Sequence, residues 1–543
     1  MSPSLLAASA PDLNGGLESL DYVVIAAYLA AMLTMGTVIA YRQRSTEDFF
    51  VGGRSLPAWA VGLSLIASLL STITYLGFPG EMFRTGLTFL ARQAAIPFTL
   101  VVVWFVWIPF FMKLNLTSAY EYLERRFNYP TRALAGFFCL CLLFGWIAVV
   151  VLTASDAMVE IVQLNLDWFF GVNGDVWRDA DIHAIILAVG LFSVLYTTLG
   201  GIRAVIWTDV IQFLILVAGA LFTIGYIAAT TGSGPADWIA AQRAYPHRES
   251  VEWFSFDPEV RSTVVTIALG AFAWHACTHG SNQIALQRYF STKDASAART
   301  SFLVNALSSF GLGLVLSAVG IALIYFIQQH PLPAYENLYT TDADVRHLAQ
   351  KSIFPQFIRI YLPAGLRGLV VAALFAAAMS TIDSGSNSAS TILTIDFFRP
   401  AFSDRLTPRK ELILARTLTA SMGLVVVVAT IGLYHLSKGT NIIDLCQKGF
   451  NCFLGPLGGL FTLAMFSRRA TPATVIPAVL GGEAFGIASS YSKELFGIQF
   501  STHLVVAGAW LTTIITSHIL SALLKTEATL EQRQWLRKAV LEK

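Results

Sequence analysis

The segment AAMSTIDSGSNSAST, residues 377–391, places seven hydroxyl side chains and one carboxylate within an otherwise apolar run. On a helix, at about 100° per residue, five of its small residues share one narrow arc: Ala377, Ser380, Thr381, Ser384 and Ser388. Asp383 and Asn387 flank that arc. Small hydroxyl residues also let membrane helices approach closely, which is the alternative interpretation of this face. An ionisable side chain inside a membrane is costly, however, so Asp383 favours a functional site.

The composition predicts an all-α polytopic membrane protein. Of the 543 residues, 55% are hydrophobic and only 13% are charged, and apolar runs long enough to cross a bilayer recur along the chain. The formal net charge of +2 gives no indication of nucleic-acid binding. The cysteines fall inside expected spans, which argues against a disulfide framework or a zinc site. We expect the lipid bilayer as surroundings, and neither a nucleic acid nor an obligate protein partner.

The apolar runs define about 13 expected transmembrane helices. They lie at 21–41, 56–80, 90–112, 131–158, 182–200, 205–230, 262–287, 301–327, 365–395, 411–436, 441–466, 472–491 and 502–524. Lysine and arginine residues concentrate in alternate loops between these spans. Because such loops stay on the cytoplasmic side, we expect the N-terminus outside and the C-terminus inside. The segments between the spans are too short to build a separate soluble domain.

Two of the spans contain residues that interrupt a helix. In span 56–80 the sequence SLLSTITYLGFPG (68–80) combines hydroxyls with two glycines and a proline, and in span 262–287 the sequence HACTHGSNQ (275–283) is similarly polar. In transporters built from inverted repeats, the first helix of each five-helix half is often broken, and freed backbone carbonyls bind sodium or substrate there. These two spans are five apart, as that architecture requires. Kinks that serve only packing are the alternative.

Five segments carry a specific combination of motifs: STEDFFVGGRSLPAWAVGLSLIAS (45–68), LTSAYEYLERRFN (116–128), YTTLGGIRAVIWTDVIQ (196–212), GSNQIALQRYF (280–290) and MSTIDSGSNSAST (379–391). Together they resemble the sodium/solute symporter family, which includes sodium-coupled sugar, proline, iodide, monocarboxylate and multivitamin transporters. The resemblance extends over essentially the whole chain.

The resemblance implies a LeuT-like core of two inverted five-helix repeats, preceded by one extra N-terminal helix numbered zero. The implied divisions are an extracellular N-terminus with helix 0 at 1–55, a first repeat at 56–230, a second repeat at 262–466, and helices 11 and 12 with a cytoplasmic tail at 467–543. Spans 56–80, 262–287 and 365–395 then become helices 1, 6 and 8.

For a principal sodium site, the resemblance implies backbone carbonyls on helix 1 and a carbonyl with two hydroxyls on helix 8. The implied ligands in this sequence are Ala67, Leu70, Ala377, Ser380 and Thr381. Oxygen ligands suit a hard cation, and the helix 8 residues lie on the arc described above. Sodium is therefore the expected co-transported ion.

Family members similar to sialic-acid transporters hold a second sodium between an aspartate on helix 5 and hydroxyls on helix 8. Here that pattern implies Asp209, Ser380 and Ser384, with Asp383 in place of a serine. The departure leaves two possibilities open: the Asp383 carboxylate strengthens a sodium site, or it exchanges a proton. Asp209 has an alternative too, as a cap of span 205–230 or a hydrated residue of the cytoplasmic vestibule.

The sequence gives the weakest indication for the residues that bind the substrate. Matching the sodium/galactose pattern gives Thr74, Gln93 and Asn282, of which only the asparagine is retained, and this disfavours a sugar. The segment LGFPGEMFRTG (76–86) more closely resembles the iodide, monocarboxylate and multivitamin transporters of the family. Arg92 could pair with a substrate carboxylate, or could instead extend to the outer membrane interface. The remaining candidates are Tyr75, whose alternative role is packing, and Gln283.

His275 and His279 lie four residues apart around Cys277, which suggests a metal site. Zinc would need further ligands, and none is evident in the sequence. The alternative is that both histidines line the central cavity as hydrogen-bond donors.

We therefore expect a sodium-coupled secondary active symporter that imports a small organic solute, with a small carboxylate or related anion favoured, by alternating access in the plasma membrane. The alternatives are a proton-coupled carrier on the same scaffold, a sodium/sugar symporter and a transporter-like solute receptor. No nucleophile–base pair or cluster of metal ligands stands out in the sequence, so an enzyme is not expected.

Overall fold

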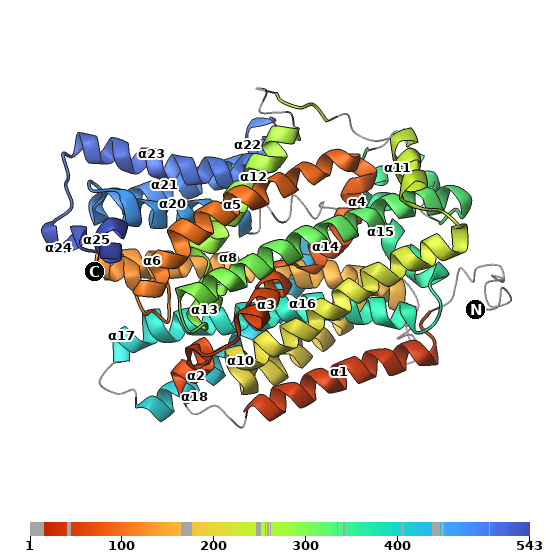
Figure 1. Ribbon diagram of the computed structural model, residues 1–543, viewed down its shortest axis with the longest axis horizontal. Coiled ribbons are helices and arrows are strands. Elements are labelled where there is room, and N and C mark those ends of the chain that lie inside the picture. Colours follow the sequence, from red (N-terminus) through yellow and green to blue (C-terminus); the bar gives the residue numbers. More distant parts are fainter. Residues whose placement is uncertain are drawn as a thin grey trace.

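The computed structural model describes residues 16–40, 45–163, 176–245, 251–255, 257, 260, 262–333, 335–339, 343–402, 407–436, 446, 450–498 and 500–542. Within these residues the regular secondary structure is helical, apart from one isolated β-bridge between Glu252 and Thr263. The long helices run roughly along one common direction (Figure 1). The predicted all-α architecture is confirmed.

The described helices follow one another in this order: α1 (Ser19–Ala40), α2 (Thr46–Val51), α3 (Ala58–Leu69), α4 (Thr72–Arg84), α5 (Ala95–Val102), α6 (Ile108–Lys113), α7 (Glu121–Arg126), α8 (Tyr129–Val162), α10 (Val176–Thr231), α11 (Pro235–Ala244), α12 (Val264–Ser281), α13 (Gln283–Phe290), α14 (Ala295–Gln329), α15 (Ala343–Tyr361), α16 (Leu366–Ile392), α17 (Arg399–Phe402), α18 (Pro408–Leu436), α20 (Cys452–Phe466), α21 (Pro472–Ser490), α22 (Ser492–Phe496), α23 (Val505–Leu523), α24 (Leu530–Arg533) and α25 (Arg537–Glu542). A 3-10 helical stretch, Gly86–Ala94, precedes α5.

In this described part, nine helices are long and apolar enough to cross a membrane, or ten if the bent pair Thr46–Arg54 and Ala58–Leu69 is one span. The expected number of about 13 is not confirmed. The two interrupted spans contribute to the difference, because each is divided into shorter helices, α3 with α4 and α12 with α13.

The predicted interruption of helix 1 lies between α3 and α4. Leu70 and Ser71 have extended backbone angles, with φ −91° and ψ 103° for Leu70 and φ −96° and ψ 173° for Ser71. The chain then resumes as α4 at Thr72 and continues through Pro79. Because neither break residue continues the helix, backbone groups that an unbroken helix would bond internally are freed at this point.

The interruption of helix 6 lies at a single residue, Asn282, with φ −82° and ψ 128°. Its side-chain oxygen accepts a hydrogen bond from the backbone N–H of Ile284 at 2.9 Å. Asparagine is a preferred residue at a helix N-terminus because its oxygen satisfies such an N–H. Asn282 therefore ends α12 and begins α13.

The expected spans 182–200 and 205–230 correspond to two helical segments of α10 that meet at a sharp kink. The bend lies at Gly201, with φ 52° and ψ −161°, which is a backbone conformation that glycine adopts far more readily than other residues. Arg203, next to the bend, donates two hydrogen bonds to the Gly52 carbonyl at 3.0 and 2.8 Å. The connection between the two segments is therefore very short, and Arg203 attaches it to Gly52, which lies shortly before α3.

Helix α16 lies in the interior of the bundle, and its residues from Ala376 to Ile392 are all buried. It packs against α1, α3, α8, α10 and α18. The polar segment that the sequence singled out thus has protein on every side, so only protein groups, on its own or on neighbouring helices, are available as hydrogen-bond partners.

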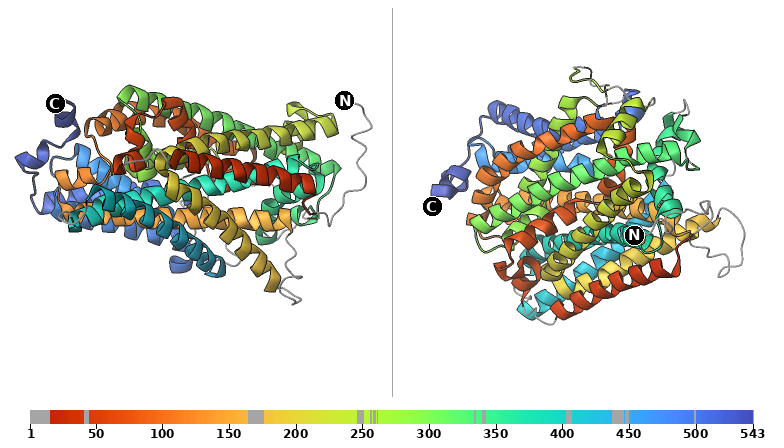
Figure 2. Two further views of the ribbon diagram at one scale, coloured as in Figure 1. Left: turned by 90° about the horizontal axis from the view of Figure 1, so that it is seen from below. Right: turned by 45° about the vertical axis from the view of Figure 1, so that its right-hand side comes forward.

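The C-terminal helices α24 and α25 pack against the protein at one end of the bundle (Figures 1 and 2). Lys113 donates to the Leu541 carbonyl at 2.8 Å, and Tyr122 donates to the Trp535 carbonyl at 3.1 Å. Arg537 donates to the Phe105 carbonyl at 2.6 Å. These contacts attach the tail to α6, to α7 and to the helix that precedes α6.

A buried ion pair holds α1 against α16. Asp21 is fully buried and accepts hydrogen bonds from Arg367 Nε at 2.9 Å and from the backbone N–H groups of Gly365 and Gly368, both at 2.7 Å. The same arginine also contacts Glu18, whose side chain is 68% exposed, at 3.0 Å. One arginine therefore has a buried and an exposed carboxylate partner.

We expect Asp21→Ala to destabilise the protein by about 3–5 kcal/mol, because it leaves the buried Arg367 charge without its buried partner. Glu18→Ala should cost less than about 1 kcal/mol, since an exposed pair is screened by water. Denaturant midpoints and apparent melting temperatures of both variants in detergent would measure the difference. Equal losses for the two variants would show that the Asp21 contacts do not anchor α1.

Candidate functional site

A cavity of about 310 Å³ lies at the break between α3 and α4. It is bounded by α4, the stretch Gly86–Ala94, α12, α14 and the start of α23. Six of the residues singled out in the sequence line it: Leu70, Thr74, Arg92, Gln93, His275 and His279. A concave site lined mostly by apolar residues with a few polar groups is typical of small-molecule binding.

Arg92 lies in the wall of this cavity. Its guanidinium carbon is 4.6 Å from the ring centroid of Phe78 and 5.2 Å from that of Phe89. Contacts of this kind with aromatic rings orient an arginine without using its N–H donors. Among the described residues Arg92 forms no hydrogen bond, but the Glu81 carboxylate, which also lines the cavity, interacts with it electrostatically.

Two amide side chains add hydrogen-bonding groups to the cavity. The Nε2 of Gln93 and the Oδ1 of Asn305 are both buried, and neither has a hydrogen-bond partner in the described part of the chain. Gly313 makes room for Gln93, because a Cβ at position 313 would lie 2.0 Å from Nε2. Asn305 was not among the predicted residues, although an amide within the apolar span 301–327 was a usable signal.

The structure does not bring Tyr75, Asn282 and Gln283 to the cavity. Tyr75 follows Thr74 directly on α4, so its side chain points to another face, where its ring lies 6.0 Å from that of Phe354. Asn282 caps α13. Gln283 accepts from the Ala119 N–H and donates to the Thr117 carbonyl, both at 3.0 Å. These amides hold the backbone rather than line the cavity.

Four of the five predicted ligands of the principal sodium site lie together where α16 crosses the end of α3. Ser380 Oγ donates to the carbonyls of Ala67 at 3.0 Å and Ala377 at 3.1 Å, and Thr381 Oγ1 also donates to the Ala377 carbonyl at 3.1 Å. The fifth, Leu70, lies three residues beyond Ala67 at the break itself and lines the cavity. Carbonyl and hydroxyl oxygens are the ligands that hard cations prefer.

Asp209 and Ser384 also lie together, and both contact Arg288. Asp209 Oδ2 accepts hydrogen bonds from Ser64 at 2.5 Å and from Ser68 at 3.0 Å, and Ser68 Oγ lies 2.7 Å from Ser384 Oγ. Arg288 forms an ion pair with Asp209 at 3.0 Å, and both side chains are fully buried. Arg288 directly follows the expected span 262–287, so the sequence did not indicate this buried contact.

Asp383 contacts the first half of α10. Its Oδ1 accepts hydrogen bonds from Ser193 and from Thr197, the latter at 2.5 Å. Ser193 also donates to the Met379 carbonyl at 3.3 Å. Two hydroxyl groups thus compensate part of the cost of burying this carboxylate.

Both histidines of α12, His275 and His279, line the cavity. His279 Nδ1 also lies 2.7 Å from the Tyr289 hydroxyl. The rings of the two histidines are stacked with centroids 6.1 Å apart. Among the described residues no three His, Cys, Asp or Glu side chains are placed to hold a metal ion.

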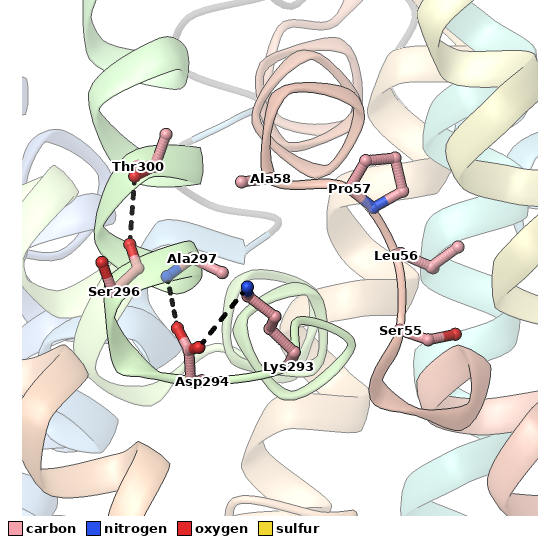
Figure 3. A pocket seen from close by; sticks show the side chains of 9 residues that line it. All are labelled: Ser55, Leu56, Pro57, Ala58, Lys293, Asp294, Ser296, Ala297 and Thr300. Atoms are coloured by element: carbon pink, nitrogen blue, oxygen red, sulfur yellow. Dashed lines mark hydrogen bonds and ion pairs between the residues drawn. The ribbon is translucent and has the colours of Figure 1, made fainter.

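A second pocket, of about 490 Å³, lies at the N-terminal ends of α3 and α14 (Figure 3). Its charged side chains face each other, since Asp294 accepts from the Ala297 N–H at 2.8 Å and lies 3.9 Å from Lys293 Nζ. It contains none of the predicted site residues. The cavity at the helix break is therefore the candidate site.

The chain is similar to sodium-coupled transporters over most of its length. It is 32% identical to the sodium/sialic acid symporter NanT of Aliivibrio fischeri, over 86% of each chain. It is 30% identical to the sodium/sialic acid symporter SiaT of Proteus mirabilis, over 90% of this chain and 94% of the relative. The structure of a Na⁺-coupled sialic acid symporter in a substrate-bound, outward-open state superposes with a TM-score of 0.78 and 27% identity, over 94% of this chain and 100% of that one.

The model of the sodium:solute symporter family matches residues 49–482, which contain the broken helix 1, most residues that line the cavity and the polar segment of α16. The fold is the LeuT-like fold of sodium symporters, and the protein is an integral membrane protein. Sodium is its co-transported ion. The chain therefore belongs to the sodium:solute symporter family.

Proposed function

We propose that this symporter imports a small organic solute bearing a carboxylate group, together with sodium, across the plasma membrane. In this proposal the N-terminus lies outside and the C-terminus inside, as the distribution of Lys and Arg among the loops suggests. The solute binds in the cavity at the break of helix 1. The observation that carries the choice of solute is the position of Arg92 in the wall of that cavity.

Arg92 suits a carboxylate for three reasons. Its planar guanidinium can donate two parallel hydrogen bonds to the two oxygens of a carboxylate. Phe78 and Phe89 fix its orientation without occupying its donors. The same contacts disfavour the alternative in which Arg92 extends to the membrane interface. Relatives of this chain transport sialic acid, which is itself a carboxylic acid.

The rest of the solute is proposed to contact Thr74, Gln93 and Asn305. Gln93 Nε2 can donate a hydrogen bond and Asn305 Oδ1 can accept one. A site built to pair such groups discriminates strongly against solutes that leave them unpaired. The solute should therefore carry both an acceptor and a donor besides its carboxylate, as a hydroxy acid or an acylamino acid does.

Sodium is proposed to bind between the carbonyls of Ala67 and Leu70 and the oxygens of Ala377, Ser380 and Thr381. An ion at this place would join the end of α3 to α16, and through Leu70 it would border the solute cavity. Sodium binding would thus stabilise the broken segment in the form that completes the cavity. This shared segment provides a physical basis for coupling the ion to the solute.

We expect the wild type, reconstituted in proteoliposomes, to take up at least one acid of a panel of small carboxylates in preference to its neutral amide. Arg92→Gln should reduce uptake of that acid by about 10- to 100-fold, since a charged hydrogen bond contributes about 1.5–3 kcal/mol. Arg399→Gln is the matched control, because Arg399 is partly exposed and pairs with Glu411. Equal uptake of acids and amides by the wild type would favour the sodium/sugar alternative.

We expect sodium, but not potassium at the same ionic strength, to raise the apparent melting temperature of the purified protein. Ser380→Ala should weaken sodium binding by about tenfold or more, because it removes one ion ligand and the link to Ala67. Ser386→Ala is the control: this serine is buried on the same helix, and its hydroxyl has no hydrogen-bond partner among the described residues. If both ions act alike on all three proteins, the proton-coupled alternative is favoured.

A further inference from the structure

Arg288 is fully buried and surrounded by oxygen atoms. Its Nη2 donates to Asp209 Oδ2 at 3.0 Å, to Ser384 Oγ at 2.6 Å and to Ser68 Oγ, and its Nε donates to Ser64 Oγ at 3.0 Å. Nη1 donates to the Ile284 carbonyl within its own helix at 3.1 Å. The guanidinium of Arg288 therefore donates hydrogen bonds to one carboxylate and three hydroxyl groups.

The partners of Arg288 come from three other helices. Ser64 and Ser68 lie on α3, Asp209 on α10 and Ser384 on α16, while Arg288 itself lies on α13. One carboxylate with several hydroxyls is a set of ligands that would also suit sodium. In this structure the positive charge at the centre of that set is a side chain of the protein.

We propose that Arg288 is the resident cation of the Asp209 site, so that the protein binds a single sodium ion, at the Ser380 site, in each transport cycle. This inference rests on the sodium site of the proposed function and specifies how many ions that function uses.

The contacts of the site support this assignment. The Asp209 carboxylate already forms an ion pair with Arg288 at 3.0 Å. A sodium ion with Asp209, Ser68 and Ser384 as ligands would have to displace the guanidinium, because Arg288 Nη2 already contacts all three. The other buried carboxylate that interacts with Arg288, Asp383, accepts hydrogen bonds from Ser193 and Thr197. The other carboxylate oxygen, Asp209 Oδ1, accepts no hydrogen bond among the described residues. Sodium can use this oxygen at low cost only when Arg288 is removed.

The same contacts tie together the two segments that adjoin the helix breaks. α3 precedes the break at Leu70, and α13 follows the break at Asn282. Arg288 fastens both segments to α10 and α16. A tethered cation can therefore do what a second sodium would do, namely hold the broken helices against the rest of the bundle, without using the sodium gradient.

The number of sodium ions bound per protein, measured by equilibrium binding of ²²Na⁺ to the purified protein, tests the proposal. The wild type should bind one ion. Arg288→Gln should bind two, because it exposes the Asp209 carboxylate and its hydroxyls to sodium. Adding Asp209→Asn to Arg288→Gln should return the number to one. Arg367→Gln, which removes a buried arginine paired with Asp21 elsewhere in the molecule, should leave the number at one.

Two ions bound to the wild type would overturn the proposal while leaving the Ser380 site intact. A folded Arg288→Gln protein that still binds one ion would also overturn it, because Arg288 would then not be what excludes the second ion. No sodium bound to the wild type would instead overturn the proposed function together with this inference. The wild-type count decides the proposal even if a variant fails to fold.

Discussion

The structure depends on how the polar segment of α16 is satisfied inside a membrane protein. Water is absent from the hydrocarbon core of a bilayer, so each buried hydroxyl, amide and carboxylate needs a partner from the protein. The partners come from several helices: Ala67 on α3 for Ser380, Thr197 on α10 for Asp383, and Gln287 on α13 for Asn387 and Ser388. Helices far apart in sequence are thereby held around one polar axis.

The break in helix 1 places two functions in contact. A continuous helix would bond the carbonyls near Ala67 and Leu70 internally, whereas the break frees backbone groups beside both α16 and the cavity. The ion site and the solute site thus share one segment of backbone. Such sharing is what coupling requires, because each ligand then stabilises the conformation that the other one binds.

Two arginines of the described chain differ in their surroundings. Arg288 forms an ion pair with Asp209, whereas Arg92 contacts two aromatic rings and interacts electrostatically with Glu81. One sodium carried with one monoanionic solute would move no net charge, so the membrane potential would contribute nothing. A tenfold sodium gradient, worth about 1.4 kcal/mol, would then limit accumulation to about tenfold. The number of sodium ions per cycle therefore sets the maximum accumulation of the solute.

The sequence alone determined the features that depend on local pattern. Apolar runs predicted the helices, the clustered hydroxyls, glycines and proline after Ala67 predicted the break, and helical periodicity predicted that Ser380 and Thr381 share a face. The side-chain partners required the tertiary structure, because they join distant positions: Arg288 and Asp209 are 79 residues apart, and Asp383 and Thr197 are 186 apart. Which face Tyr75 takes, and whether Gln283 meets a solute or a loop, likewise depends on helices that the local sequence does not specify.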